Sequence, residues 1–74
     1  MAGDPAAAKE WWLRAVRADP RLASAWLRLG NLYEREGDLE RARAAWREFL
    51  RHARQKYPRE QAEVAAKLGP SGAG

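Results

Sequence analysis

Residues 26–46 read WLRLGNLYEREGDLERARAAW, and the spacing of large and small residues in this stretch decides the fold. Trp26, Leu29 and Tyr33 recur at intervals of three and four residues, which places them on one face of an α-helix. Gly37 interrupts the pattern, because glycine tolerates the left-handed conformation that ends many helices. The same spacing then resumes up to the final tryptophan. The stretch therefore predicts two amphipathic helices joined by a tight turn.

Prolines, glycines and aspartates divide the rest of the chain in the same way. Asp4 is a helix-capping residue followed by Pro5, and Asp38 is placed to cap the third helix. The expected helices cover residues 5–18, 22–36, 39–57 and 59–68. No segment alternates between apolar and polar residues as a strand does. Because short connections force neighbouring helices to be antiparallel, the sequence predicts an all-α stack of helical hairpins with about four helices.

Composition excludes several classes of function. The chain has 74 residues, no cysteine and one histidine, so it is a single small unit without disulfides, thiolate metal sites or cysteine nucleophiles. Neither a nucleophile paired with a base nor a metal-ligand spacing is present. We therefore expect no enzyme activity, no cofactor and no metal, and we interpret His52 as a surface or half-buried residue of a basic helix.

Hydropathy and charge limit the classes of partner that the sequence predicts. No apolar run approaches the roughly 20 residues that cross a bilayer, and the first residues lack a basic and apolar leader, so we expect a cytoplasmic protein without membrane contact. The net charge is +4. Residues 41–59 hold seven basic residues against one acidic residue, which gives this stretch a charge of +6. Acidic protein surfaces are therefore candidate partners.

An internal repeat relates the first helix to the third. Sliding the chain by 34 residues aligns Ala8 with Ala42, Trp12 with Trp46 and Arg17 with Arg51. Within the second and third helices, the pattern is W-x2-L-G-x2-Y followed by A-x3-aromatic, formed by Trp26, Leu29, Gly30, Tyr33, Ala42 and Trp46. Both the period and the pattern resemble the tetratricopeptide repeat.

The resemblance implies a short α-solenoid that begins halfway through a repeat. Residues 4–69 would form one domain, in which 4–18 correspond to the second helix of a repeat and 22–57 to a full repeat. Residues 59–69 would form a shortened cap similar to a first helix, because Leu68-Gly69 stands where the full repeat has Leu29-Gly30. We expect residues 70–74 to form a flexible tail. Such a solenoid implies a scaffold for protein–protein interaction.

The signature positions also predict how the helices pack. Gly30 and small alanines let helix backbones approach, while the tryptophans fill the gaps between them. Phe49 stands where the first helix has Ala15, and the last helix offers only small residues, namely Ala62, Ala65 and Ala66. We therefore expect the last helix to pack on the third with its alanines against Phe49, and the third helix to continue past Arg54 to the proline at 58.

Trp11 is the strongest candidate for an interface. The repeat has an aromatic residue at Trp12, but the position of Trp11 corresponds to Ala45, so the packing of the repeat does not require it. Two interpretations remain open: Trp11 shields the end of a thin core, or it forms an interface with a partner or a second copy, where tryptophan is enriched.

A basic stripe on the third helix is the second candidate. Arg43, Arg47, Arg51 and Arg54 follow one another at four, four and three residues. The stripe is either a solvated face or a contact for an acidic protein surface. Nucleic-acid binding is disfavoured, because no aromatic platform for bases accompanies the arginines. An acidic cluster at the turn between the second and third helices offers a matching surface for a neighbouring copy, and it consists of Glu34, Glu36, Asp38 and Glu40.

The family resemblance adds a third candidate, a peptide groove on the first helix of the full repeat. Some tetratricopeptide proteins clamp a C-terminal carboxylate with Lys, Asn and Arg, and Asn31 and Arg28 match two of these positions here, with Arg35 nearby. Leu27 occupies the place of the clamp lysine, and a complete groove needs about three repeats. One copy therefore offers only part of such a groove.

Two hypotheses for the function follow. The leading one is head-to-tail self-association into a ring or a helical filament, in which the last helix of one copy partners the first helix of the next. The alternative is a small adaptor that binds a peptide or the C-terminal segment of a larger protein near Arg28, Asn31 and Arg35.

Overall fold

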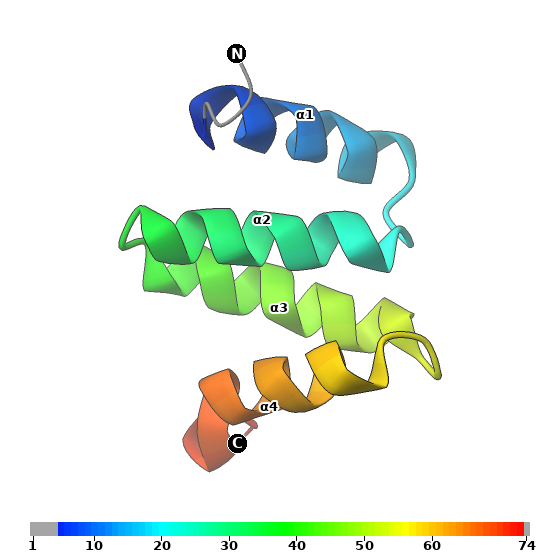
Figure 1. Cartoon of the computed structure of the whole chain (residues 1–74), viewed down its shortest axis with the longest axis vertical. Coiled ribbons are helices and arrows are strands. Elements are labelled where there is room, and N and C mark those ends of the chain that lie inside the picture. The colour runs from blue at the N-terminus through cyan, green and yellow to red at the C-terminus, as the bar shows by residue number, and fades with distance from the viewer. Residues whose placement is uncertain (1–4, 74) are drawn as a thin grey trace.

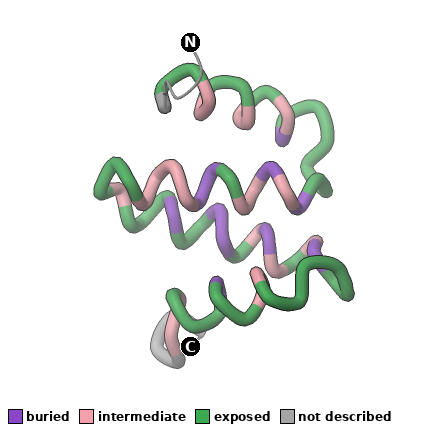
Figure 2. Tube along the Cα trace, viewed as in Figure 1, coloured by how far each residue is buried: buried purple, intermediate pink, exposed green. Residues whose placement is uncertain are grey.

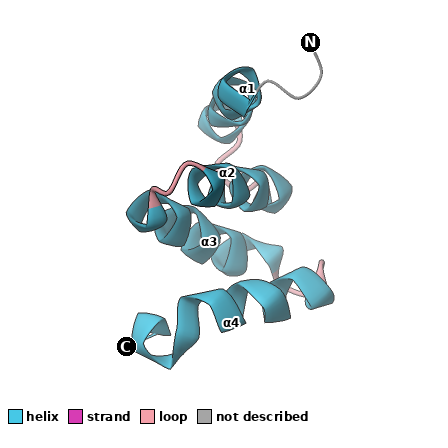
Figure 3. Ribbon diagram, turned by 60° about the vertical axis from the view of Figure 1, so that its left-hand side comes forward, coloured by secondary structure: helices cyan, strands magenta, loops and turns pink. Residues whose placement is uncertain are grey.

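Four helices stacked in chain order make up the fold. The computed structural model describes the backbone of residues 5–73, which contains no strand, and the side chains of residues 6–69. The helices are α1 (Pro5–Ala18), α2 (Ala23–Arg35), α3 (Leu39–Ala53) and α4 (Pro58–Ala73). Each runs antiparallel to the next, with α1 on the outer side of α2 and α4 on the outer side of α3 (Figures 1 and 3). The predicted all-α stack of hairpins is confirmed, whereas the predicted cap at Asp4 lies outside the described residues.

The α2–α3 hairpin is built on a contact between Gly30 and Trp46. Gly30 is buried in α2, and the indole of Trp46 in α3, only 2% exposed, lies directly against it. A Cβ at residue 30 would overlap the Cδ1 and Nε1 atoms of that indole. Around this contact, Ala42 and Phe49 of α3 are fully buried. The expected packing of a large side chain against a small residue is therefore present at the centre of the core.

The turn between α2 and α3 has the local chemistry that the sequence predicted. Gly37 adopts φ 82°, its N–H donates to the carbonyl of Glu34, and the N–H of Asp38 donates to the carbonyl of Tyr33. This pair of bonds satisfies carbonyls that the end of a helix leaves free. The Asp38 carboxylate then accepts from the N–H of Arg41 at 3.3 Å and caps α3.

On the other side of the hairpin, α1 covers α2. Val16 of α1 is buried in a cluster with Ala25, Leu29 and Ala45, and the half-buried Trp12 packs against this cluster. Figure 2 shows that burial is concentrated where α2 meets α3, while much of α1 remains exposed. α1 is therefore attached along one stripe only.

The C-terminal end of α3 differs from the prediction. The helix ends at Ala53 rather than near residue 57, because Arg54 leaves the helical conformation with φ 53°. Tyr57 also has a positive φ, of 58°. The resulting loop turns the chain back so that α4 lies across α3, and Gln61 Nε2 donates to the carbonyls of Arg54 and Lys56 that the turn exposes. Tertiary packing thus overrides the helix-forming residues 54–56.

The last helix packs on α3 as predicted, but with other residues. Val64 is 2% exposed and joins the core beside Phe49 and Ala53, and Leu68 packs against the same cluster. The three alanines expected at this interface, Ala62, Ala65 and Ala66, are all exposed. The larger side chains bury more apolar surface, so α4 turns Val64 and Leu68 toward α3 and presents its alanines outward.

Residues 69–73 also differ from the expectation. Gly69 breaks the helix with φ 71° and ψ 168°, as its residue type suggested, but a further helical turn follows and ends at Ala73. The structure therefore has a kinked continuation of α4 in the place of the flexible tail, and Gly74 lies outside the described residues.

The substitution Gly30→Ala tests the central contact. Helix propensity alone would make this change stabilising by about 1 kcal/mol. Because the added methyl group overlaps Trp46, we expect instead a loss of about 1–3 kcal/mol in the free energy of unfolding, as for other overpacked cores. Urea unfolding followed by circular dichroism measures the sign, and a stabilised variant would contradict the central role of the contact.

Candidate functional site

The candidate site is a face of α1 that corresponds to the core face of α3. We call it the α1 repeat face; its residues are Ala8, Trp11, Trp12 and Ala15. The shift of 34 residues relates them to Ala42, Ala45, Trp46 and Phe49. The four α3 residues are at most 3% exposed. On α1, by contrast, Trp11 is 67% exposed and the other three are half-buried.

Two shallow hollows follow the α1 repeat face. One has a volume of about 440 Å³ and is lined by Ala8, Trp12, Arg28, Asn31, Leu32 and Arg35. The other, of about 200 Å³, is lined by Trp11, Arg14 and Ala15. Apolar side chains of α1 contribute to the lining of both hollows.

The predicted groove residues meet the α1 repeat face in the first of these hollows. Arg28, Asn31 and Arg35 come from one face of α2, and Trp12 closes the hollow from α1. Asn31 has a second contact, because its Oδ1 lies 3.4 Å from Nε1 of the buried Trp46. Asn31 therefore also belongs to the packing of the α2–α3 hairpin.

The basic stripe is separate from this site. Arg43, Arg47 and Arg51 are exposed on α3, and α2 lies between α3 and α1 (Figure 1). Arg51 pairs with Glu48 at 3.7 Å. Arg54, predicted to extend the stripe, lies beyond the end of α3 in the loop. His52 is half-buried and has its Nε2 3.5 Å from the Glu48 carboxylate.

Most of the acidic cluster is engaged within the chain, which sequence analysis did not anticipate. Lys9 of α1 bonds Glu36 at 2.8 Å with its Nζ 5.6 Å from the centre of the Tyr33 ring. In the same manner, Lys67 of α4 bonds Glu34 at 3.0 Å and lies 5.0 Å from the Trp46 ring. Through these ion pairs, α1 and α4 are attached to the α2–α3 hairpin near the turn at Gly37. No local pattern marks them, because each partner lies at least 27 residues away in the chain.

Asp38 also pairs within the chain, with Arg41 at 3.7 Å. Three of the four carboxylates that a neighbouring copy was expected to meet are thus engaged by basic residues of their own chain. In the described residues, no group of three or more acidic or histidine side chains is placed to hold a metal ion. None of the described helices has the length and apolar composition needed to cross a membrane.

A comparison with protein families bears on the repeat. The family model described as Tetratricopeptide repeat matches residues 11–44, from Trp11 in α1 through all of α2 to Ala44 in α3. The chain contains a tetratricopeptide repeat. No curated protein and no solved structure matches the chain. A tetratricopeptide repeat implies a role in protein–protein interaction.

The Lys9 contact makes the attachment of α1 depend on pH. The hydrogen bond to the Glu36 carboxylate raises the pKa of Lys9 above its ordinary value of 10.5. A raised pKa means that the folded state holds the proton more tightly, so the stabilisation is complete below pH 10.5 and is lost as the pH rises through the folded pKa. We expect the stability difference between the wild type and Lys9→Gln to shrink above pH 10.5 in urea unfolding. Lys56→Gln, in the α3–α4 loop, is the control, and a Lys9 difference that does not change with pH would contradict this account.

Proposed function

We propose that this tetratricopeptide chain is a non-enzymatic scaffold whose copies associate head to tail, with α4 of one copy docked on the α1 repeat face of the next. The observation that carries the proposal is the exposed Trp11 on a face whose counterpart in α3 is buried. Exposed tryptophan beside other apolar residues is typical of interaction surfaces.

The internal repeat indicates what kind of element fits the α1 repeat face. In α3, the corresponding face holds α2, which is the first helix of the repeat. The element that fits α1 by the same packing is therefore a helix of the first-helix type, antiparallel to α1. α2 of the same copy packs on α1 around Val16, with Trp12 and Ala15 at the edge of that contact, and leaves Trp11 exposed. A second copy offers a first-helix type element in α4.

The alignment of α4 with α2 supports α4 as that helix. Leu68-Gly69 stands at the position of Leu29-Gly30, and Val64 at that of Ala25. Ala25 and Leu29 pack toward α1, and Val64 and Leu68 pack toward α3, so both helices use corresponding residues against the preceding helix. The other face of α2 packs on α3. The corresponding face of α4 is open and consists of Ala62, Ala65 and Ala66.

An exchange of large and small residues makes the two open faces complementary. Within the chain, the first-helix residue Trp26 is large and packs against the cluster that contains the small Ala45. Between copies the sizes are reversed, because Ala65 takes the position of Trp26 and Trp11 that of Ala45. Such an exchange keeps the packed volume similar. Trp11 would then fill the space that the missing tryptophan of α4 leaves.

This contact joins two different surfaces, so each copy keeps one face of each kind for a further neighbour. A contact of this type closes into a ring or continues as a helical filament, according to the rotation between copies. An interface between two α1 helices would use the same surface twice and would stop at a dimer.

The substitution Trp11→Ala tests the proposal. Light scattering over a concentration series should show wild-type assemblies that grow well beyond the 8.4 kDa chain, and the variant should remain at that mass with unchanged helicity. Leu39→Ala removes another exposed apolar side chain, 49% exposed and outside the α1 repeat face, and should leave the assembly intact. A wild-type chain that stays at 8.4 kDa, or a Trp11→Ala assembly of unchanged mass, would refute self-association through this face.

A compensating exchange extends the same test to α4. Ala65→Trp alone should disrupt the assembly, because two tryptophans then compete for one space. The double variant Trp11→Ala, Ala65→Trp has the large residue on α4 and the small residue on α1, as the hairpin has Trp26 on α2 and Ala45 on α3. This variant should assemble again. Disruption by Trp11→Ala with no effect of Ala65→Trp would place the partner of Trp11 elsewhere.

A second candidate function is supported by the hollow between α1 and α2. It brings Arg28, Asn31 and Arg35 together beside the indole of Trp12, in a volume that accepts a few peptide residues. On this alternative, the chain is a small adaptor that binds the C-terminal segment of a larger protein. Arg28 and Arg35 would meet the terminal carboxylate.

A labelled peptide with a free C-terminal carboxylate, compared with its amidated copy, tests the adaptor function by fluorescence anisotropy. We expect about tenfold weaker binding for the amidated peptide and for Arg35→Gln, which corresponds to one charge-assisted hydrogen bond. Arg43→Gln, on the other side of α2, serves as the matched control. Equal binding of the two peptides would exclude carboxylate recognition.

A further inference from the structure

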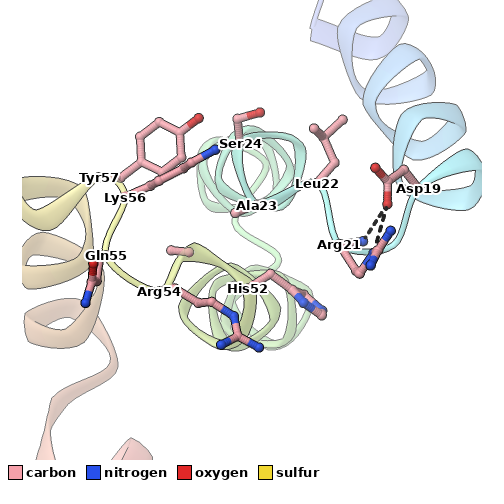
Figure 4. A pocket seen from close by; sticks show the side chains of 11 residues that line it. Asp19, Arg21, Leu22, Ala23, Ser24, His52, Arg54, Gln55, Lys56 and Tyr57 are labelled. Atoms are coloured by element: carbon pink, nitrogen blue, oxygen red, sulfur yellow. Dashed lines mark hydrogen bonds and ion pairs between the residues drawn. The ribbon is translucent and has the colours of Figure 1, made fainter.

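A basic hollow lies at the other end of the α2–α3 hairpin, opposite the Gly37 turn. Its volume is about 610 Å³, and the turn between α1 and α2, the start of α2, the end of α3 and the α3–α4 loop all contribute to its lining. Figure 4 shows the lining side chains arranged around the end of the hairpin, with Asp19 and Arg21 on one side and Lys56 and Tyr57 on the other. Neither the α1 repeat face nor the groove residues take part in it.

The charges of the hollow are predominantly positive. Arg21, Arg54 and Lys56 line it, together with His52. The carboxylate in the lining belongs to Asp19, which already accepts from the N–H of Arg21 at 3.1 Å and lies 3.8 Å from its guanidinium. Three fixed positive charges against one partly engaged carboxylate attract an anionic ligand.

The loop that carries two of these cations is held in place by α4. Gln61 Nε2 donates to the carbonyl of Lys56 at 2.6 Å and also to that of Arg54. The ring of Tyr57 lies 6.1 Å from that of the buried Phe49. Because these contacts fix the loop before any ligand arrives, less conformational entropy is lost on binding.

Apolar surface accompanies the charge. Leu22 and Tyr57 line the hollow and are each 38% exposed, although both are large hydrophobic residues. A ligand with charged groups alone would leave the side chains of Leu22 and Tyr57 exposed to solvent. The chemistry of the site therefore matches a chain that carries carboxylates next to an apolar side chain, and its volume lies in the range that is common for ligand pockets.

We propose that this hollow binds an acidic peptide segment. Its carboxylates contact Arg21, Arg54 and Lys56, and its apolar side chain packs between Leu22 and Tyr57. Because the residues come from the loops at one end of the hairpin, the site is complete in a single copy and does not depend on head-to-tail assembly. The chain then has two separate interaction surfaces, one for another copy of itself and one for an acidic peptide of a partner protein.

The binding of a fluorescein-labelled peptide of alternating Glu-Glu-Leu units tests the site by fluorescence anisotropy. We expect binding that weakens about tenfold or more on Lys56→Glu and on Arg21→Glu, because each reversal replaces an attraction with a repulsion. Arg43→Glu changes the net charge equally but lies outside the hollow, and it should alter the affinity less than threefold. Replacing Glu by Gln in the peptide should abolish binding. Circular dichroism confirms that each variant keeps its helices, and Lys56→Gln provides a milder variant that should give a smaller loss.

Three outcomes would overturn the proposal. If the peptide does not bind, the hollow does not recognise acidic peptides. If Arg43→Glu lowers the affinity as much as the variants of the hollow do, the peptide is held by general charge attraction. If a single-stranded oligonucleotide displaces the peptide at a lower concentration than unlabelled peptide does, the surface binds nucleic acid. Repeating the titration with Trp11→Ala separates the two proposals, because this variant should lose assembly and keep peptide affinity. A wild-type chain that binds the peptide but never assembles would refute head-to-tail association and would leave the peptide site supported.

Discussion

The contact between the backbone of Gly30 and the indole of Trp46 is the constraint on which the rest of the structure depends. Only a residue without a side chain lets α2 approach α3 so closely, and only a large flat side chain fills the space that this approach creates. The remaining core residues of α3, among them Ala42 and Phe49, are arranged along the same line. The outer helices α1 and α4 pack on the two outer sides of this hairpin (Figure 1).

The outer helices are held in a different way from the hairpin. Each has a narrow apolar stripe, centred on Val16 in α1 and on Val64 in α4, and each is fastened near the Gly37 turn by one lysine. Lys67 bonds Glu34 in the last turn of α2, Lys9 bonds Glu36 just beyond the end of that helix, and both lysines lie over an aromatic ring. This attachment leaves the remaining face of each outer helix open, and these open faces are the surfaces on which the proposed assembly rests.

The distribution of tryptophan and alanine distinguishes the surfaces that the chain closes from those that it leaves open. In the closed hairpin, the first helix supplies Trp26 and the second helix Ala45. On the open faces the order is reversed, with Trp11 on the second-helix type α1 and Ala65 on the first-helix type α4. In the proposed assembly, this reversed pattern would place Trp11 of one copy against Ala65 of the next, so that a large residue again meets a small one.

The sequence by itself determined the features that depend on neighbouring residues. The apolar spacing gave the four helices, the 34-residue period gave the tetratricopeptide repeat, and the turn at Gly37 and the cap at Asp38 followed from the conformations that these residue types favour. The sequence also singled out Trp11, because the corresponding residue of the repeat is Ala45, but it left open whether Trp11 shields the core or stays exposed. Only the tertiary structure decided where α3 ends, which face of α4 is buried and where the lysines bind. Each of these depends on contacts between segments far apart in the chain: residues 54–56 favour a helix locally, but the burial of Val64 and the hydrogen bonds of Gln61 require the chain to turn at Arg54. The basic hollow formed for the same reason, since two loops about 35 residues apart meet only once the helices have stacked.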